Sequence, residues 1–386
     1  MPKWATGTCQ KHSVEQARSA ISRFAVSPLS AVADALQRAL EAGSQAGISP
    51  TEMTALAEYI VKITDRLPQT FEERFWFDAA LIQAIANAWS EEPLFPSMLV
   101  PAYDREWGHA RLPMPLSEPA NSQGFRLHVL ELILFPRSPN LREVNLLEYP
   151  WLAHELAHSL MFRFDELLVK RVDPVFSSIV RRRRLAAAAD RDRIRTVALS
   201  AINEFQTLWR PTPDHRNWTH EISADLIAAS LLGPVYFAAF TDLLDGDSKN
   251  PYQVSPGHPP YVLRVTALQR IGNRLGFPTK DLDRLEDSFA KSRWRSGRSN
   301  KLLSLADAEL VEAILEGVQH FCKNLRLRPW NAGRVKELGA TIQQETPALG
   351  VDLLTAAWMA FNEFGENQYS VWQKRIIQAH VDGFTQ

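Results

Sequence analysis

Residues 150–160 read Pro-Trp-Leu-Ala-His-Glu-Leu-Ala-His-Ser-Leu and contain the pattern H-E-x-x-H. On a helix, His154 and His158 project from one face because they lie four residues apart, so both imidazoles can reach one metal ion. Glu155 follows one step round the helix and can take a proton from water at the open side of such an ion. The pattern therefore predicts a helix that carries two metal ligands and a general base.

Apolar residues border this pattern on both sides. Leu152, Leu156 and Leu160 form an apolar ridge beside the two histidines. Ala153 and Ala157 allow another element to pack closely against the same helix. Histidines buried in such surroundings are costly unless they have partners. A solvated helix face with two surface histidines is the alternative, and the apolar flanks argue against it.

The composition is that of an ordinary soluble globular chain. Hydrophobic residues make up 45% of the 386 residues, charged residues make up 23%, and the net charge is −1. So small a net charge gives no general electrostatic reason to bind nucleic acid or acidic membranes. Two cysteines, Cys9 and Cys322, make no disulfide framework and favour a reducing compartment.

No targeting or membrane-spanning segment is expected. Residues 1–16 are polar and do not resemble a signal peptide. The most apolar run, residues 226–240, is too short to cross a bilayer and is interrupted by Gly233 and Pro234. These features predict a cytoplasmic protein without a membrane span, and they leave its oligomeric state open.

A third metal ligand is expected in residues 217–229. A catalytic zinc site takes three protein ligands and keeps one position open, whereas a structural site takes four. Ile222, Leu226 and Ala229 recur at helical spacing, which predicts a buried helix. Two carboxylates one turn apart, Glu221 and Asp225, would lie on the same face of this helix.

Burying both carboxylates is costly unless each binds something. Glu221 as metal ligand and Asp225 as acceptor of an N–H from a ligand histidine would satisfy both groups. His220 and Asp214 are the competing third ligands. Zinc is the expected ion, although histidine and carboxylate ligands also admit other divalent metals.

His154-Glu155-x-x-His158 followed by Glu221-x-x-x-Asp225 resembles the gluzincin class of zinc metallopeptidases. The long gap between the two motifs is similar to the family of the CAAX prenyl protease and the bacterial membrane heat-shock zinc protease. That family also carries a later H-P-x-x-x-x-R segment, and residues 258–264 read His-Pro-Pro-Tyr-Val-Leu-Arg with the same spacing. The resemblance covers about residues 125–275.

The resemblance implies that His258 and Arg264 lie near the metal, but it does not fix their roles. His258, Tyr261 or Arg264 could donate to the oxygen that becomes negative when water attacks a peptide carbonyl. Arg264 could instead hold the Glu221 helix in place, or the segment could be a plain helix N-terminus. Members of the family are commonly membrane-embedded and this chain lacks spanning segments, so a lipidated or membrane-protein substrate is not implied.

The remaining segments are expected to be mostly helical. Residues 11–95 read as helices, with a start signal at residues 49–52 and an aromatic-rich helix at residues 75–89. Residues 94–119 read as a connecting loop and residues 125–135 as a strand. A substrate peptide could pair with a free edge of this strand beside the metal, and an ordinary sheet strand is the alternative.

The metal-binding helix is expected to end near Pro174 and to be followed by a basic helical stretch. Arg181 to Arg184 are consecutive, so they point in different directions on a helix. A solvated helix face is therefore favoured over a patch for nucleic acid. Residues 279–386 return to helices, which are expected at residues 304–321, 351–364 and 370–381.

The predicted fold class is α+β, mostly α. A zincin-like catalytic core with a small sheet is expected at residues 120–278, between helical regions at residues 1–119 and 279–386. The predicted function is that of a zinc-dependent metalloendopeptidase acting on a protein or peptide substrate. Its zinc ligands are His154, His158 and Glu221, and Asp225 supports them. Its catalytic residues are Glu155, His258 and Arg264.

Two other functions remain as alternatives. One is a catalytically silent zincin-like protein that binds or regulates a partner through its helical flanks. The other is a nucleic-acid-associated protease that uses Arg181 to Arg184.

Overall fold

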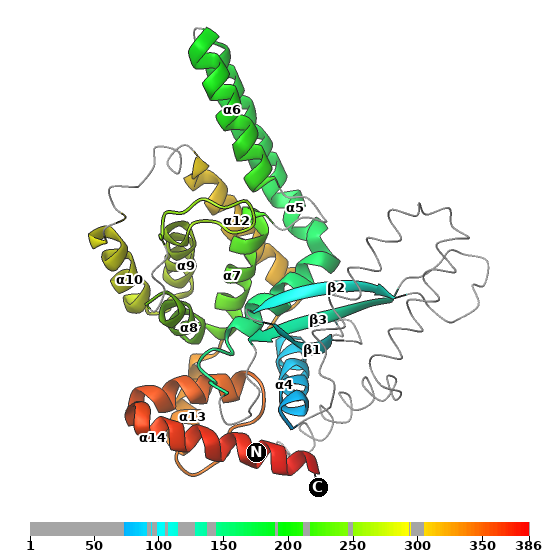
Figure 1. Ribbon diagram of the computed structural model, residues 1–386, viewed down its shortest axis with the longest axis vertical. Coiled ribbons are helices and arrows are strands. Elements are labelled where there is room, and N and C mark those ends of the chain that lie inside the picture. Colours follow the sequence, from blue (N-terminus) through cyan, green and yellow to red (C-terminus); the bar gives the residue numbers. More distant parts are fainter. Residues whose placement is uncertain are drawn as a thin grey trace, which may run out of the picture. The chain divides into compact units, whose positions relative to one another are not determined.

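A computed structural model of the 386-residue chain describes most residues after position 72. The described residues are 73–90, 94, 99–104, 107–114, 128–136, 144–189, 192–210, 217–245, 250–292, 294 and 305–385. The helix start expected at residues 49–52 and the other helices expected before residue 73 lie outside them. Helices dominate the described part and three strands form one small sheet (Figure 1), which confirms the predicted α+β, mostly α class.

The chain divides into two compact units. The first unit combines residues 1–146 with residues 333–386, and the second unit comprises residues 147–332. The sequence predicted three regions with boundaries after residues 119 and 278, which differ from the boundaries of these two units. The three-region division stays a prediction.

The sheet belongs to the first unit and has the strand order β1-β3-β2. β1 (Leu99–Asp104) runs parallel to β3 (His128–Pro136), and β2 (Gly108–Met114) runs antiparallel to β3 on its other side. Two predictions are therefore wrong. Residues 94–119 are not simply a loop, because they supply β1 and β2. The strand expected at residues 125–135 is the central strand β3, so it has no free edge for a substrate peptide.

Helices complete the first unit. α4 (Glu73–Trp89) packs against β1 and against α14 (Val351–Thr385), and α13 (Ala332–Thr341) precedes α14. α4 confirms the helix predicted at residues 75–89. The helices predicted at residues 351–364 and 370–381 are both present and are joined within α14 at Gly365. The φ of Gly365 is +70°, a conformation that glycine adopts without steric cost.

The buried His380 of α14 should make the first unit sensitive to acid. Burial lowers the pKa of His380 from 6.5 to about 4, although a backbone hydrogen bond at Pro347 raises it in part. As the pH falls through this window, the unfolded chain binds a proton that the folded chain does not yet bind, so stability is lost. We expect His380 to reduce the free energy of unfolding by about 3 kcal/mol across the window. Urea unfolding at several pH values measures this loss.

The matching variant is His380→Leu, which has no group to titrate at this position. It should flatten the decline of stability across the same pH window. An unchanged pH dependence in the variant would assign the acid sensitivity to other groups.

In the second unit, α7 (Trp218–Leu232) lies at the centre (Figure 1). Its neighbours are α5 (Trp151–Ala188), α6 (Asp192–Trp209), α8 (Pro234–Asp245), α9 (Tyr261–Leu275) and α12 (Ala308–Asn324). α10 (Lys280–Lys291) packs on α8 and α9. Nearly every side chain of α7 is buried, as the apolar spacing of residues 217–229 predicted.

α5 is longer than predicted. It continues through Pro174 to Ala188, with one non-helical residue at Phe164 where the helix kinks. A proline inside a helix removes a backbone hydrogen bond and costs about 3 kcal/mol. Packing beyond Pro174 opposes this cost, since Phe176 is buried and stacks on Phe205 of α6 at a ring distance of 5.8 Å. The predicted end near Pro174 is therefore wrong.

The arginine run near the end of α5 contacts the neighbouring helices. Arg182 forms an ion pair with Glu309 of α12, and Arg183 forms one with Asp307, the N-cap of α12, at 3.0 Å. Arg184 donates to Gln206 of α6 at 3.0 Å. These contacts join α5 to α12 and α6, so the run is not only a solvated face.

No helix in the described ranges is long and apolar enough to cross a membrane. Cys322, on α12, is a free thiol, and Cys9 lies outside the described residues.

Candidate metal centre

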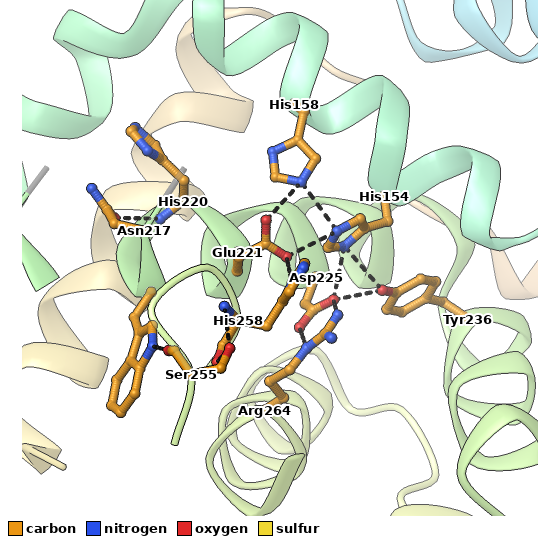
Figure 2. A network of polar contacts seen from close by, with 11 residues as sticks. His154, His158, Asn217, His220, Glu221, Asp225, Tyr236, Ser255, His258 and Arg264 are labelled. Carbon is orange, nitrogen blue, oxygen red and sulfur yellow. Dashed lines mark hydrogen bonds and ion pairs between the residues drawn. The ribbon is translucent and has the colours of Figure 1, made fainter. Parts of the chain in front are cut away.

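The first turns of α5 place both predicted histidine ligands on one side of a buried helix. Every side chain from Trp151 to Met161 is buried. His154 and His158 meet edge to face with their ring centroids 4.7 Å apart, and their Nε2 atoms are 3.1 Å apart. The spacing of the H-E-x-x-H pattern is thus realised as two imidazoles that point at a common position (Figure 2).

Glu221 comes to the same position from the first turn of α7. The helix begins after Asn217, whose side chain accepts a hydrogen bond from the backbone N–H of His220 at 3.2 Å. The N-terminal end of a helix favours negative charge, which suits a carboxylate in the first turn. Glu221 Oε2 lies 3.5 Å from His154 Nε2, and Glu221 Oε1 lies 3.3 Å from His158 Nε2.

These distances are short enough for the three side chains to share one metal ion. Ligand atoms about 2.0–2.1 Å from a tetrahedral zinc ion are about 3.3–3.4 Å apart. The two Nε2 atoms are 3.1 Å apart, and a different oxygen of Glu221 faces each of them, Oε2 at 3.5 Å from His154 and Oε1 at 3.3 Å from His158. Glu221 Oε1 is also buried without a hydrogen bond in the described part of the chain, as expected for an oxygen that binds an ion. Among the described residues, these three side chains are the one group arranged to hold a metal.

The electrostatics keep the carboxylate of Glu221 ionised. Burial raises the pKa of Glu221, but the charge of His158 and the polar contacts with His154, His158 and His258 hold that pKa well below its usual value. Burial lowers the pKa of His154, but its hydrogen bonds to Asp225 and Glu221 outweigh this effect and raise the pKa to about 9. A metal ion at Nε2 of His154 would have to displace the proton that these acceptors favour.

Asp225 supports His154 from behind, as predicted. Asp225 lies one turn after Glu221 on α7 and is fully buried. Its Oδ1 is 2.9 Å from His154 Nδ1. Because a carboxylate can only accept here, His154 carries a proton on Nδ1, and its Nε2 faces His158 and Glu221.

Arg264, on α9, pairs with Asp225 and not with the group of metal ligands. Its Nε donates to Oδ2 and its Nη2 donates to Oδ1, both at 2.6 Å. Burial opposes the charge of Asp225, but the adjacent guanidinium of Arg264 lowers the pKa of Asp225 to about 2. Of the roles left open by the sequence, this geometry matches the one in which Arg264 holds the Glu221 helix.

His258 lies at the exposed side of the centre. Its Nδ1 is 3.1 Å from Glu221 Oε2, and its side chain is 64% exposed. The segment before α9 is tied to α7, because Trp218 Nε1 donates to the carbonyl of Ser255 at 2.8 Å, and the backbone N–H of His258 donates to Ser255 Oγ at 3.1 Å. His258 therefore reaches the Glu221 carboxylate from a loop that is hydrogen-bonded to α7.

The other candidate residues have separate positions. Glu155 is buried on α5 and lies close enough to His154 for its charge to raise the pKa of that imidazole. Tyr261 is half-buried at the first position of α9. Figure 2 shows the His220 ring beside Asn217 and away from the two ligand histidines. Asp214 lies outside the described residues.

Sequence reasoning did not identify Tyr236. This tyrosine of α8 is fully buried and donates to Asp225 Oδ1 at 2.6 Å (Figure 2). The sequence signal for it is a tyrosine within the apolar run of residues 226–240. A tyrosine buried in such a run needs a hydrogen-bond partner for its hydroxyl.

Comparison with known proteins adds no relative. No protein family, curated protein or solved structure matches this chain.

Proposed function

We propose that this chain is a zinc-dependent metallopeptidase that hydrolyses peptide bonds. The proposal is carried by one observation, the convergence of His154, His158 and Glu221 at one buried position, with contacts of 3.1–3.5 Å between their nitrogen and oxygen atoms. Three protein ligands leave one position open, which is the arrangement of catalytic zinc sites. The membership of a gluzincin-type family remains part of this proposal, supported by the motifs at residues 154–158, 221–225 and 258–264.

A zinc ion held there would act as a Lewis acid, which lowers the pKa of water and polarises a carbonyl group. Glu155, next to His154 on α5, would take a proton from the attacking water and pass it to the leaving amine. His258 lies on the exposed side of Glu221, where a substrate carbonyl could accept a hydrogen bond from it. Arg264 would act through Asp225 and not on the substrate.

The metal content of the purified chain tests the proposed site. The wild type should bind close to one zinc ion per chain, and Glu221→Ala should lose most of it, because two histidines alone hold zinc weakly. Glu363→Ala is the control, since Glu363 is exposed on α14. Full zinc occupancy in Glu221→Ala would show that another residue is the third ligand.

A catalytically silent metal-binding protein is the second candidate. The burial of the three ligands favours it, because only 3%, 2% and 1% of His154, His158 and Glu221 is exposed and a substrate must reach the ion. This candidate predicts zinc binding without peptide cleavage. The nucleic-acid alternative has less support, because Arg182 and Arg183 form ion pairs with Glu309 and Asp307.

A further inference from the structure

Asp225 Oδ1 is the meeting point of side chains from three helices. It accepts from His154 Nδ1 of α5 at 2.9 Å, from Tyr236 Oη of α8 at 2.6 Å and from Arg264 Nη2 of α9 at 2.6 Å (Figure 2). We call these four residues the Asp225 network. Three of them belong to the motifs described above, and Tyr236 does not.

The position of Tyr236 is fixed by its own helix and by aromatic packing. α7 is followed by its C-cap Gly233, whose φ is +57°, and α8 begins at the next residue. A Cβ at Gly233 would lie 2.7 Å from the ring of Trp330, so a larger residue would disturb this turn. The Tyr236 ring packs edge-on against Trp151 at 5.8 Å, and Trp151 in turn packs edge-on against His154 at 5.7 Å.

The hydroxyl of Tyr236 also lies 3.4 Å from His154 Nδ1. Because Asp225 only accepts, the hydroxyl proton must point at Asp225, and the lone pairs of the phenol oxygen are then available to His154. An unprotonated Nδ1 would face two oxygen atoms and be repelled by both. Tyr236 and Asp225 together therefore favour a proton on Nδ1 and leave Nε2 for the ion.

We propose that Tyr236 is a positioning residue of the metal centre, which holds the His154 imidazole through Asp225 in the orientation that presents Nε2 to the ion. This inference rests on the proposed function. Tyr236 acts on both partners of this contact, because its hydroxyl donates to Asp225 Oδ1 at 2.6 Å and its oxygen lies 3.4 Å from His154 Nδ1. The burial of the network strengthens these hydrogen bonds, because water does not compete for them.

Tyr236→Phe removes only the hydroxyl, and Tyr252→Phe is its matched control. Tyr252 is a second buried tyrosine of the same unit, and its hydroxyl donates to the backbone carbonyl of Phe289 at 3.2 Å. Zinc affinity is measured by competition with a chelator for the wild type and both variants. Loss of a side chain that orients a metal ligand weakens metal binding about 10-fold to 100-fold. Because Asp225 remains, we expect about 10-fold weaker binding for Tyr236→Phe and a change within about twofold for Tyr252→Phe.

Proton NMR of the metal-free protein gives a second readout. The Nδ1 proton of His154 should be protected from exchange with water in the wild type and in Tyr252→Phe, and it should exchange faster in Tyr236→Phe.

Wild-type zinc affinity in Tyr236→Phe, or an equal loss of zinc affinity in Tyr252→Phe, would overturn the inference while leaving the peptidase proposal intact. A wild type that binds no zinc would instead reject the proposed function. Even if the wild type binds no zinc, an unchanged exchange rate of the His154 Nδ1 proton in Tyr236→Phe would show that Tyr236 does not position this imidazole.

Discussion

Replacing Glu155 by glutamine should lower kcat for peptide hydrolysis by about 10³-fold while zinc stays bound. Glutamine has nearly the same shape as glutamate but cannot accept a proton from water at neutral pH. Glu155 is not one of the three ligands that converge on the metal position, so zinc content should not change. KM should change little, because the role of Glu155 is to move a proton and not to bind substrate.

Glu166→Gln is the control for this substitution. Glu166 lies on the same helix, its side chain is 78% exposed, and it pairs with Lys170 across one helical turn. It should retain the wild-type rate. The comparison requires a substrate, which is found by incubating the zinc-loaded wild type with a mixed peptide library and analysing the products by mass spectrometry. If the wild type binds zinc but cleaves nothing, or if Glu155→Gln cleaves as fast as the wild type, the chain is not a peptidase of this type.

The residues of the candidate metal centre could be chosen from the sequence because helix geometry is local. His154 and His158 are four residues apart, as are Glu221 and Asp225, and this spacing fixes which side chains share a face. The contact between the two helices is not local, and it was predicted from the cost of burying carboxylates without partners. The observed distance of 2.9 Å between His154 Nδ1 and Asp225 Oδ1 agrees with that reasoning.

The strands could not be predicted in the same way. β1 and β2 contain Pro101, Gly108 and Pro113, which in a local reading indicate turns. Both are edge strands, where a proline is tolerated because one side of the strand needs no hydrogen bonds. β1 and β2 form because each supplies the backbone hydrogen bonds that one edge of β3 needs. Pairing between segments that are distant in the sequence leaves no periodic pattern in the sequence of β1 or of β2.

Tyr236 illustrates a similar limit at the site itself. Its position beside Asp225 depends on how α8 turns back after Gly233 and on packing against Trp151. Neither contact has a fixed sequence spacing. The same holds for Arg264, because a spacing within residues 258–264 places it on α9 but does not say which carboxylate it will meet.

Arg264→Met should lower the free energy of unfolding of the metal-free protein by about 3–5 kcal/mol. The Arg264 side chain is 6% exposed and that of Asp225 is fully buried. Water therefore cannot solvate the carboxylate when the guanidinium is removed. Removing the guanidinium leaves the Asp225 carboxylate buried without its positively charged partner. The carboxylate keeps only the hydrogen bonds from Tyr236 and His154 among those described above. Urea unfolding of both proteins measures the difference.

Arg334→Met is the matched control because it removes a similar pair at the surface. Arg334 contacts both oxygens of Asp352 and also pairs with Glu337 at 2.8 Å, and its side chain is 46% exposed. Water can solvate the groups left behind, so this substitution should cost less than about 1 kcal/mol. Equal losses for Arg264→Met and Arg334→Met would mean that burial does not determine the strength of the Asp225–Arg264 pair.

A double substitution separates the stabilising role of this pair from its role at the metal centre. Replacing a buried ion pair by apolar residues of similar volume is often neutral for stability. Asp225→Leu combined with Arg264→Met should therefore recover much of the stability lost in Arg264→Met. It should not recover zinc affinity, because His154 Nδ1 has then lost its acceptor and the imidazole is no longer held toward the ion. If zinc affinity returned together with stability, Asp225 would serve only to fix the helices. A stable double variant that binds zinc weakly would show that the carboxylate is required by the metal centre itself.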